Sequence, residues 1–154
     1  AGTTGIQARG RVCVRRGREG GAAIRTFLEL VAGTAAEGGQ VEAVRQAAAA
    51  LGEALDAIKC VTARLTTGDA GNPLEQNAAA TDYLRLFALV AFGWLWVRMA
   101  LVAAAKGEAA TPHEKRKIEI ARFFATRILP QSLALASQIS GGSAPLMAIA
   151  SEAF

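Results

Sequence analysis

The chain has 154 residues, of which 52% are hydrophobic and 19% are charged, and its formal net charge is +4. This length suits one domain, and the apolar fraction is high enough to build a core, which excludes a disordered chain. Ala is abundant and β-branched runs are scarce, so the composition favours helix over strand.

The first segment, residues 1–21, is rich in Gly and Arg, and Val12 and Val14 are too few to define an amphipathic face. We predict a loop followed by a weak helix that needs a partner. The arginines raise the possibility of binding nucleic acid or an anionic membrane. No aromatic residue stands between them to stack on bases. We therefore expect a solvated helix face, or a surface that meets an acidic partner or phosphate, and no nucleic acid.

A short helix is predicted next, from apolar residues at i, i+3, i+4 and i+7: Ile24, Phe27, Leu28 and Val31. We expect Gly33 and the pair at 38–39 to end it.

A heptad seam, with apolar residues at alternating steps of three and four, predicts a long second helix. Its members are Val41, Val44, Ala48, Leu51, Leu55, Ile58, Thr62 and Leu65. The small Ala48 permits close approach of a neighbour, whereas Gly52 costs roughly 1 kcal/mol relative to Ala. We expect this helix to lie along its neighbours at a shallow angle, as in an antiparallel bundle.

A third, long helix is predicted from Pro73 to about Lys106. Asn72 is placed to cap it, with Pro73 at the first position and Glu75 at the third. Residues 83–105 are apolar almost all round, and a helix of this kind is buried in a bundle or in lipid.

We do not expect this helix to span a membrane. Arg85 and Arg98 leave only residues 86–97 uninterrupted, and a span needs about 20 apolar residues. Trp94 and Trp96 would suit a membrane surface, so a membrane-facing patch stays open as an alternative.

The last part of the chain predicts a long helix and a short one. Thr111 to Glu114 form a capping box with Pro at the first helical position. Pro130 lies inside this helix and should kink it, and the glycines at 141–142 should end it. Ser143 should then cap a short helix over 145–150. The whole sequence thus predicts an all-α antiparallel bundle of three long helices and two short ones.

Candidate catalytic groups are few. His113 is the only histidine and has no Cys, Asp or second His nearby, so we predict no metal site and no Ser-His-Asp set. Glu114 and Glu119 lie on different helix faces, and Asp82 and Arg85 are spaced to pair locally. From these residues alone, we interpret the chain as a helical bundle with no active site of its own.

The two cysteines, Cys13 and Cys60, lie far apart and have no metal-type spacing. The sequence shows no secretory signal. We therefore expect a cytoplasmic protein without a disulfide.

Several segments of the sequence resemble those of a known enzyme family. Residues 2–7, Gly-Thr-Thr-Gly-Ile-Gln, resemble the late signature of acyl-CoA dehydrogenases, Tyr-Glu-Gly-Thr-x-x-Ile-Gln, which precedes the last helix of the dehydrogenase core. Later segments resemble the extra C-terminal domain of one branch, which includes enzymes acting on 3-methylmercaptopropionyl-CoA. These segments are 82–87 (Asp-Tyr-Leu-Arg-Leu-Phe), 93–96 (Gly-Trp-Leu-Trp), 121–124 (Ala-Arg-Phe-Phe), 128–130 (Ile-Leu-Pro) and 145–147 (Pro-Leu-Met).

The resemblance implies an FAD enzyme that removes hydrogen across the α and β carbons of an acyl-CoA, with the flavin taking hydride and a Glu taking the proton. That Glu immediately precedes the Gly-Thr pair in the family, and Ala1 stands at its position here, so we assign no catalytic residue. By the same carry-over, Thr3 and Gly5 lie where the family touches FAD, and Gln7 lies near the adenosine end of the cofactor.

The resemblance also implies two parts: residues 1–21 as the end of the dehydrogenase core, and 22–154 as an appended helical-bundle domain. Gly10 and the extra arginines depart from the family and weaken the last core helix. We expect FAD and acyl-CoA to bind the parent enzyme and no cofactor to bind this part alone. The expected partners are the rest of the core and further copies. A stand-alone interaction module and a membrane-surface module remain the alternatives.

Overall fold

The structure is a computed structural model and describes residues 21–67 and 72–148. Its elements are α2 (Gly21–Gly39), α3 (Arg45–Thr67), α4 (Pro73–Ala105), the 3-10 turn η3 (Gly107–Ala109), α5 (Pro112–Arg127), α6 (Gln131–Ser140) and α7 (Ala144–Met147). The described residues contain helices and no strand, which confirms the predicted all-α class.

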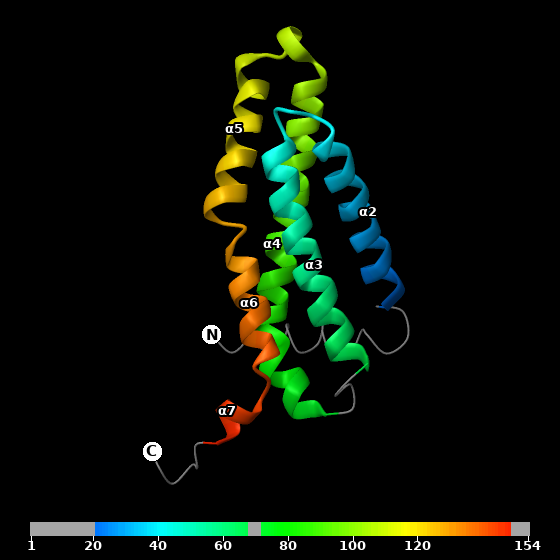
Figure 1. The fold of residues 1–154 in the computed structure, drawn as a ribbon, viewed down its shortest axis with the longest axis vertical. Coiled ribbons are helices and arrows are strands. Elements are labelled where there is room, and N and C mark those ends of the chain that lie inside the picture. The colour runs from blue at the N-terminus through cyan, green and yellow to red at the C-terminus, as the bar shows by residue number, and fades with distance from the viewer. Residues whose placement is uncertain (1–20, 68–71, 149–154) are drawn as a thin grey trace.

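The helices form an antiparallel bundle around α4 (Figure 1). Helix α4 contacts α2, α3, α5 and α6, and α3 also contacts α2, α5 and α6. In Figure 1 the chain runs up α2, down α3, up α4 and down α5 and α6. The first turn of α2 therefore lies at the same end of the bundle as the last turns of α3 and α6 and the start of α4.

The predicted heptad seam forms the centre of the core. Its buried members are Val44, Ala48, Leu51, Leu55, Ile58 and Leu65, and Val41 packs partly buried against them. Helix α3 begins only at Arg45, because the preceding residues form a turn in which the Val44 and Arg45 amides both donate to the Val41 carbonyl. The seam was therefore predicted correctly, and the start of its helix was placed too early.

Two of the three predicted side-chain caps, at Asn72 and Thr111, are present. The Asn72 side chain accepts a hydrogen bond from the Leu74 amide at 3.0 Å, with Pro73 at the first helical position. Thr111 accepts from the Glu114 amide while the Glu114 carboxylate accepts from the Thr111 amide, which completes the capping box. These contacts satisfy amides that a helix start otherwise leaves without partners.

Helix α2 is longer than predicted. It runs through Gly33 and ends at Gly39, so it has 19 residues and is not a short helix. Gly33 lies on the exposed side, where a glycine weakens a helix by roughly 1 kcal/mol and does not by itself stop it. The packing of Val31 and Gly38, both buried, holds the helix on either side of Gly33.

The predicted long helix over 112–140 is broken in two. Helix α5 ends at Arg127 and α6 begins at Gln131, with Ile128 and Pro130 as the two flanking cap residues. Proline disfavours helical backbone at the residue before it and lacks an amide proton. The Leu129 amide accordingly donates to the Phe124 carbonyl, five residues back. The interruption was predicted at the correct residue, Pro130. A kink within one helix was expected there, whereas the structure has two separate helices.

Candidate functional site

One side of α4 is left uncovered by the other helices. We define the open face of α4 as eight partly or fully exposed residues at alternating steps of three and four: Ala78, Thr81, Arg85, Ala88, Phe92, Leu95, Met99 and Val102. Phe92, Leu95 and Val102 have exposed fractions of 56%, 42% and 62%. Because exposed aliphatic and aromatic side chains gain free energy when another surface covers them, this face is a candidate contact surface.

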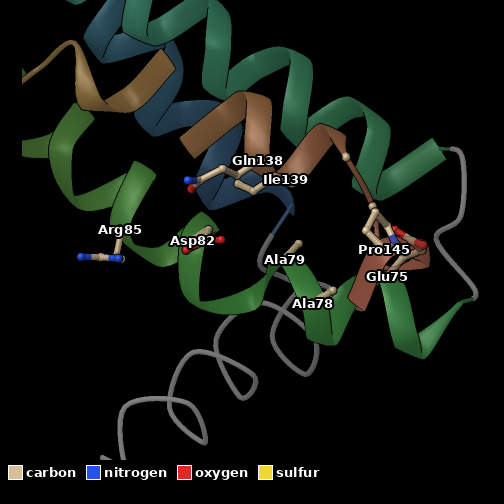
Figure 2. A pocket seen from close by; sticks show the side chains of 10 residues that line it. Glu75, Ala78, Ala79, Asp82, Arg85, Gln138, Ile139 and Pro145 are labelled. Carbon is tan, nitrogen blue, oxygen red and sulfur yellow. The ribbon is translucent and has the colours of Figure 1, made fainter. Parts of the chain in front are cut away.

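Hollows run along the seam between this face and the α5 and α6 helices. The first, of about 490 Å³, lies at the start of α4 and the end of α6 (Figure 2), and it is lined by Glu75, Ala78, Ala79, Asp82, Arg85, Gln138, Ile139, Gly141, Gly142 and Pro145. The second, of about 430 Å³, continues along α4 past Arg85, Ala88 and Phe92. A third, of about 400 Å³, lies beside Met99 and Val102 and is bordered by Lys117 of α5.

Glu75 fastens the C-terminal turn to α4 at the edge of the first hollow. The Ser143 amide donates to Glu75 Oε1 at 2.9 Å, and the Ser143 hydroxyl donates to the same oxygen at 2.5 Å. The Ser143 hydroxyl, the Ser143 amide and the charge of Arg64 hold the pKa of Glu75 below its usual value, against the opposing effect of burial. We call this pair the Glu75–Ser143 latch.

A glycine shapes the latch. Gly142 has φ +73, a left-handed conformation that side chains other than glycine disfavour. A Cβ added there would lie 3.1 Å from Glu75 Oε2. The Arg64 guanidinium supports the same turn by donating to the Ser140 carbonyl.

The charges in the first hollow do not form the predicted local pair. Asp82 and Arg85 are not joined by an ion pair among the described residues, and the Arg85 side chain points away from Asp82 (Figure 2). Arg85 lines both the first and the second hollow. The prediction of a local Asp82–Arg85 pair was wrong because the two side chains turn to different sides of the hollow.

His113 is exposed in the first turn of α5, at the opposite end of the bundle from the latch. Within residues 21–67 and 72–148, no group of three or more His, Cys, Asp and Glu side chains converges as metal ligands would. The apolar open face of α4 is the feature of these residues that is suited to contact another surface.

The two tryptophans of α4 are engaged within the bundle. The Trp94 indole donates to Thr34 Oγ1 at 2.9 Å, and its ring lies edge-on to Phe27 at 5.6 Å and under Arg98 at 4.8 Å. Trp96 is partly buried, with Lys117 over its ring at 5.6 Å. Both rings therefore contact side chains of neighbouring helices. The membrane-surface alternative, which used these tryptophans together with the arginines, stays a prediction.

By length and composition alone, α4 meets the criterion for a helix that crosses a membrane. This was not predicted from the sequence, because only the uninterrupted apolar residues between Arg85 and Arg98 were counted there. The central helix of a soluble bundle meets the same criterion. Helix α4 contacts four other helices, and 39% of its most apolar window is buried in the bundle.

The predicted cofactor residues Thr3, Gly5 and Gln7, and Ala1 at the family Glu position, lie outside the described residues. Sequence reasoning missed the Glu75–Ser143 latch. It assigned Ser143 as the cap of the last helix, but that side chain makes no cap hydrogen bond and reaches Glu75 instead. No sequence signal links residues 68 positions apart.

Comparison with known proteins identifies the domain. A search of curated proteins found no match. A family profile described as acetyl-CoA dehydrogenase C-terminal like matches residues 22–150, most of the chain and all of its described helices. The chain therefore belongs to the acetyl-CoA dehydrogenase C-terminal-like family.

Proposed function

We propose that this chain is the C-terminal part of an FAD-dependent acyl-CoA dehydrogenase and that its helical bundle serves as a structural domain that packs against the rest of the enzyme and supports its oligomerisation. The observation that carries this proposal is the open face of α4. Three of its large apolar side chains are 42% to 62% exposed, although α4 is the central helix of the bundle. Such a surface fits a partner better than water.

In this proposal the chemistry belongs to the parent. Residues 1–21 end its dehydrogenase core, and 22–154 form the appended domain. FAD, contacted by Thr3, Gly5 and Gln7, takes up hydride from an acyl-CoA, and the bundle contributes no reacting group. The cytoplasmic location also remains a prediction, and we propose neither nucleic acid nor a membrane as a partner.

The test is to join this chain to the rest of its enzyme. We expect no flavin binding by the 154-residue chain alone. Co-expression with the N-terminal part of the parent should give a complex with the flavin absorbance bands, and an acyl-CoA should bleach them. Flavin bound by this chain alone would contradict the division of roles. An N-terminal part that binds FAD and turns over equally well, and equally stably, without this chain would contradict the structural role.

A further inference from the structure

The residues on the open face of α4 are sorted by size along the helix. Its first half carries the smaller side chains Ala78, Thr81 and Ala88, together with Arg85. Its second half carries the larger apolar side chains Phe92, Leu95, Met99 and Val102. The first two hollows lie beside the small half, and the third lies between the large half and α5. Phe92, Leu95 and Val102, which are 42% to 62% exposed, lie on the large half.

A face with small side chains at one end and large side chains at the other is complementary in size to its own reverse. We propose that a second copy of this chain binds the open face, with the two α4 helices antiparallel and related by a two-fold axis at the level of Val90. An isologous contact of this kind closes on itself as a dimer. The proposal rests on the proposed structural role and names the surface and the partner through which oligomerisation would occur.

The heptad spacing fixes which residues meet. In an antiparallel pair of helices, the first position of each heptad faces the fourth position of the partner. About Val90, this pairing places Phe92 on Ala88, Leu95 on Arg85, Met99 on Thr81 and Val102 on Ala78, each contact occurring twice. Every large side chain thus lies over a small one or over the aliphatic stem of Arg85, whose guanidinium can reach water along the hollow.

A parallel arrangement does not give this match. It would oppose Phe92 to Phe92 and Ala88 to Ala88, so that the large halves crowd and the small halves leave a void. Overpacking and voids both weaken a contact. The order of sizes along α4 therefore selects the antiparallel arrangement.

The surface is large enough for a stable dimer. Residues 78 to 102 span about 36 Å at 1.5 Å per residue. Helix α4 and the adjoining layer of α5 and α6 are about 20 Å wide together, since one helix is about 10 Å across. The product is on the order of 700 Å² per copy, close to the roughly 800 Å² per partner that stable interfaces bury.

The pairing of Ala88 with Phe92 provides the test. Sedimentation equilibrium of the 154-residue chain should give a monomer–dimer equilibrium, in reducing buffer because Cys60 is exposed. Ala88→Phe opposes two large rings and Phe92→Ala leaves a void, so each should raise the dimer Kd at least about tenfold. The double variant Ala88→Phe/Phe92→Ala exchanges the two sizes and should restore the Kd to within about threefold of the original.

Leu30→Ala is the matched control, because Leu30 is 55% exposed on α2, outside the open face, and it should leave the Kd unchanged. Circular dichroism confirms that each variant is folded. A chain that is monomeric at every concentration overturns the proposal, as does a double variant weaker than both single ones. A monomer whose Phe92→Ala change abolishes binding to the N-terminal part of the parent would assign the face to the core and leave the proposed function standing. A monomer that binds phosphatidylglycerol vesicles, and loses this binding in the Phe92→Ala variant, would assign the open face to a membrane.

Discussion

Gly38 and Ala48 make the closest helix-to-helix approach among the described glycines, where α2 crosses α3. A Cβ built on Gly38 would lie 2.7 Å from the Ala48 Cβ and 3.3 Å from Val97 Cγ1. Side-chain carbons do not approach so closely, so only glycine fits. The small Ala48 was predicted from the sequence to permit a close neighbour, and that neighbour is Gly38.

The first prediction is that Gly38→Ala destabilises the fold. Alanine is the better helix former by roughly 1 kcal/mol. The added methyl would press on Ala48, whose Cβ cannot turn away, and overpacking of a core costs about 1–3 kcal/mol. We expect a net loss of up to about 2 kcal/mol in the free energy of unfolding, measured by urea titration.

Gly52→Ala is the control for this experiment. Gly52 lies inside α3, and a Cβ built there has nothing within 4 Å. The same substitution should therefore stabilise the protein by about 0.5–1 kcal/mol. If both variants shifted the urea midpoint in the same direction, the close approach of α2 and α3 would not be what excludes a side chain at Gly38.

A hydrogen bond between α3 and α4 leads to the second prediction. The Thr62 and Tyr83 hydroxyls lie 2.7 Å apart, and Tyr83 is 3% exposed. Removing either hydroxyl deletes this hydrogen bond, so Tyr83→Phe and Thr62→Val should each cost about 1 kcal/mol. The double variant should cost less than the sum of the two, with a coupling of about 0.5–1.5 kcal/mol. Strictly additive losses would show that the bond contributes nothing to stability.

The sequence predicted those features that neighbouring residues determine. The cap at Asn72, the box at Thr111 and the seam of α3 each depend on residues within a few positions, and each is confirmed. The break at Pro130 was located correctly because proline acts on its own backbone. The prediction that Gly33 ends its helix was wrong, because the effect of a glycine depends on packing elsewhere along α2, which helix propensity alone does not describe.

The features of the site were harder to predict because they depend on distant segments. The seam of α3 pointed to one buried face, but α4 is apolar almost all round, so its sequence does not say which side stays uncovered. That side is set by the positions of α2, α5 and α6. The Glu75–Ser143 latch likewise needs the end of α6 to return to the start of α4.

The third prediction concerns the latch. Gly142→Ala forces a side chain into φ +73, close to the Glu75 carboxylate, and the left-handed conformation costs about 1–2 kcal/mol for residues other than glycine. We expect the turn to open more often, with the Ser143 amide exchanging hydrogen roughly tenfold faster. Ser140→Ala is the control, since its hydroxyl bonds the Ala136 carbonyl and not Glu75. Unchanged exchange at Ser143 in Gly142→Ala would argue against the latch.

The fourth prediction is a loss of stability in acid through Glu114. Hydrogen bonds from Lys106, and then from the amide and hydroxyl of Thr111, lower the pKa of Glu114 from 4.5 to about 2. The folded state therefore favours the ionised carboxylate. Its contribution to stability is fully present above the unfolded-state pKa and is lost as the pH falls from about 4.5 toward about 2.

Thermal unfolding of the protein and of Glu114→Gln between about pH 7 and about pH 2.5 checks this, since linkage makes the difference in Tm between them depend on pH. The variant should melt lower near neutral pH, and the two curves should converge in acid as the carboxylate is protonated. Lys106→Met removes the largest cause of the shift, so its curve should fall between the other two. Parallel curves across the whole range would show that the capping box gains nothing from the charge of Glu114, and that its neutral hydrogen bonds alone hold the start of α5.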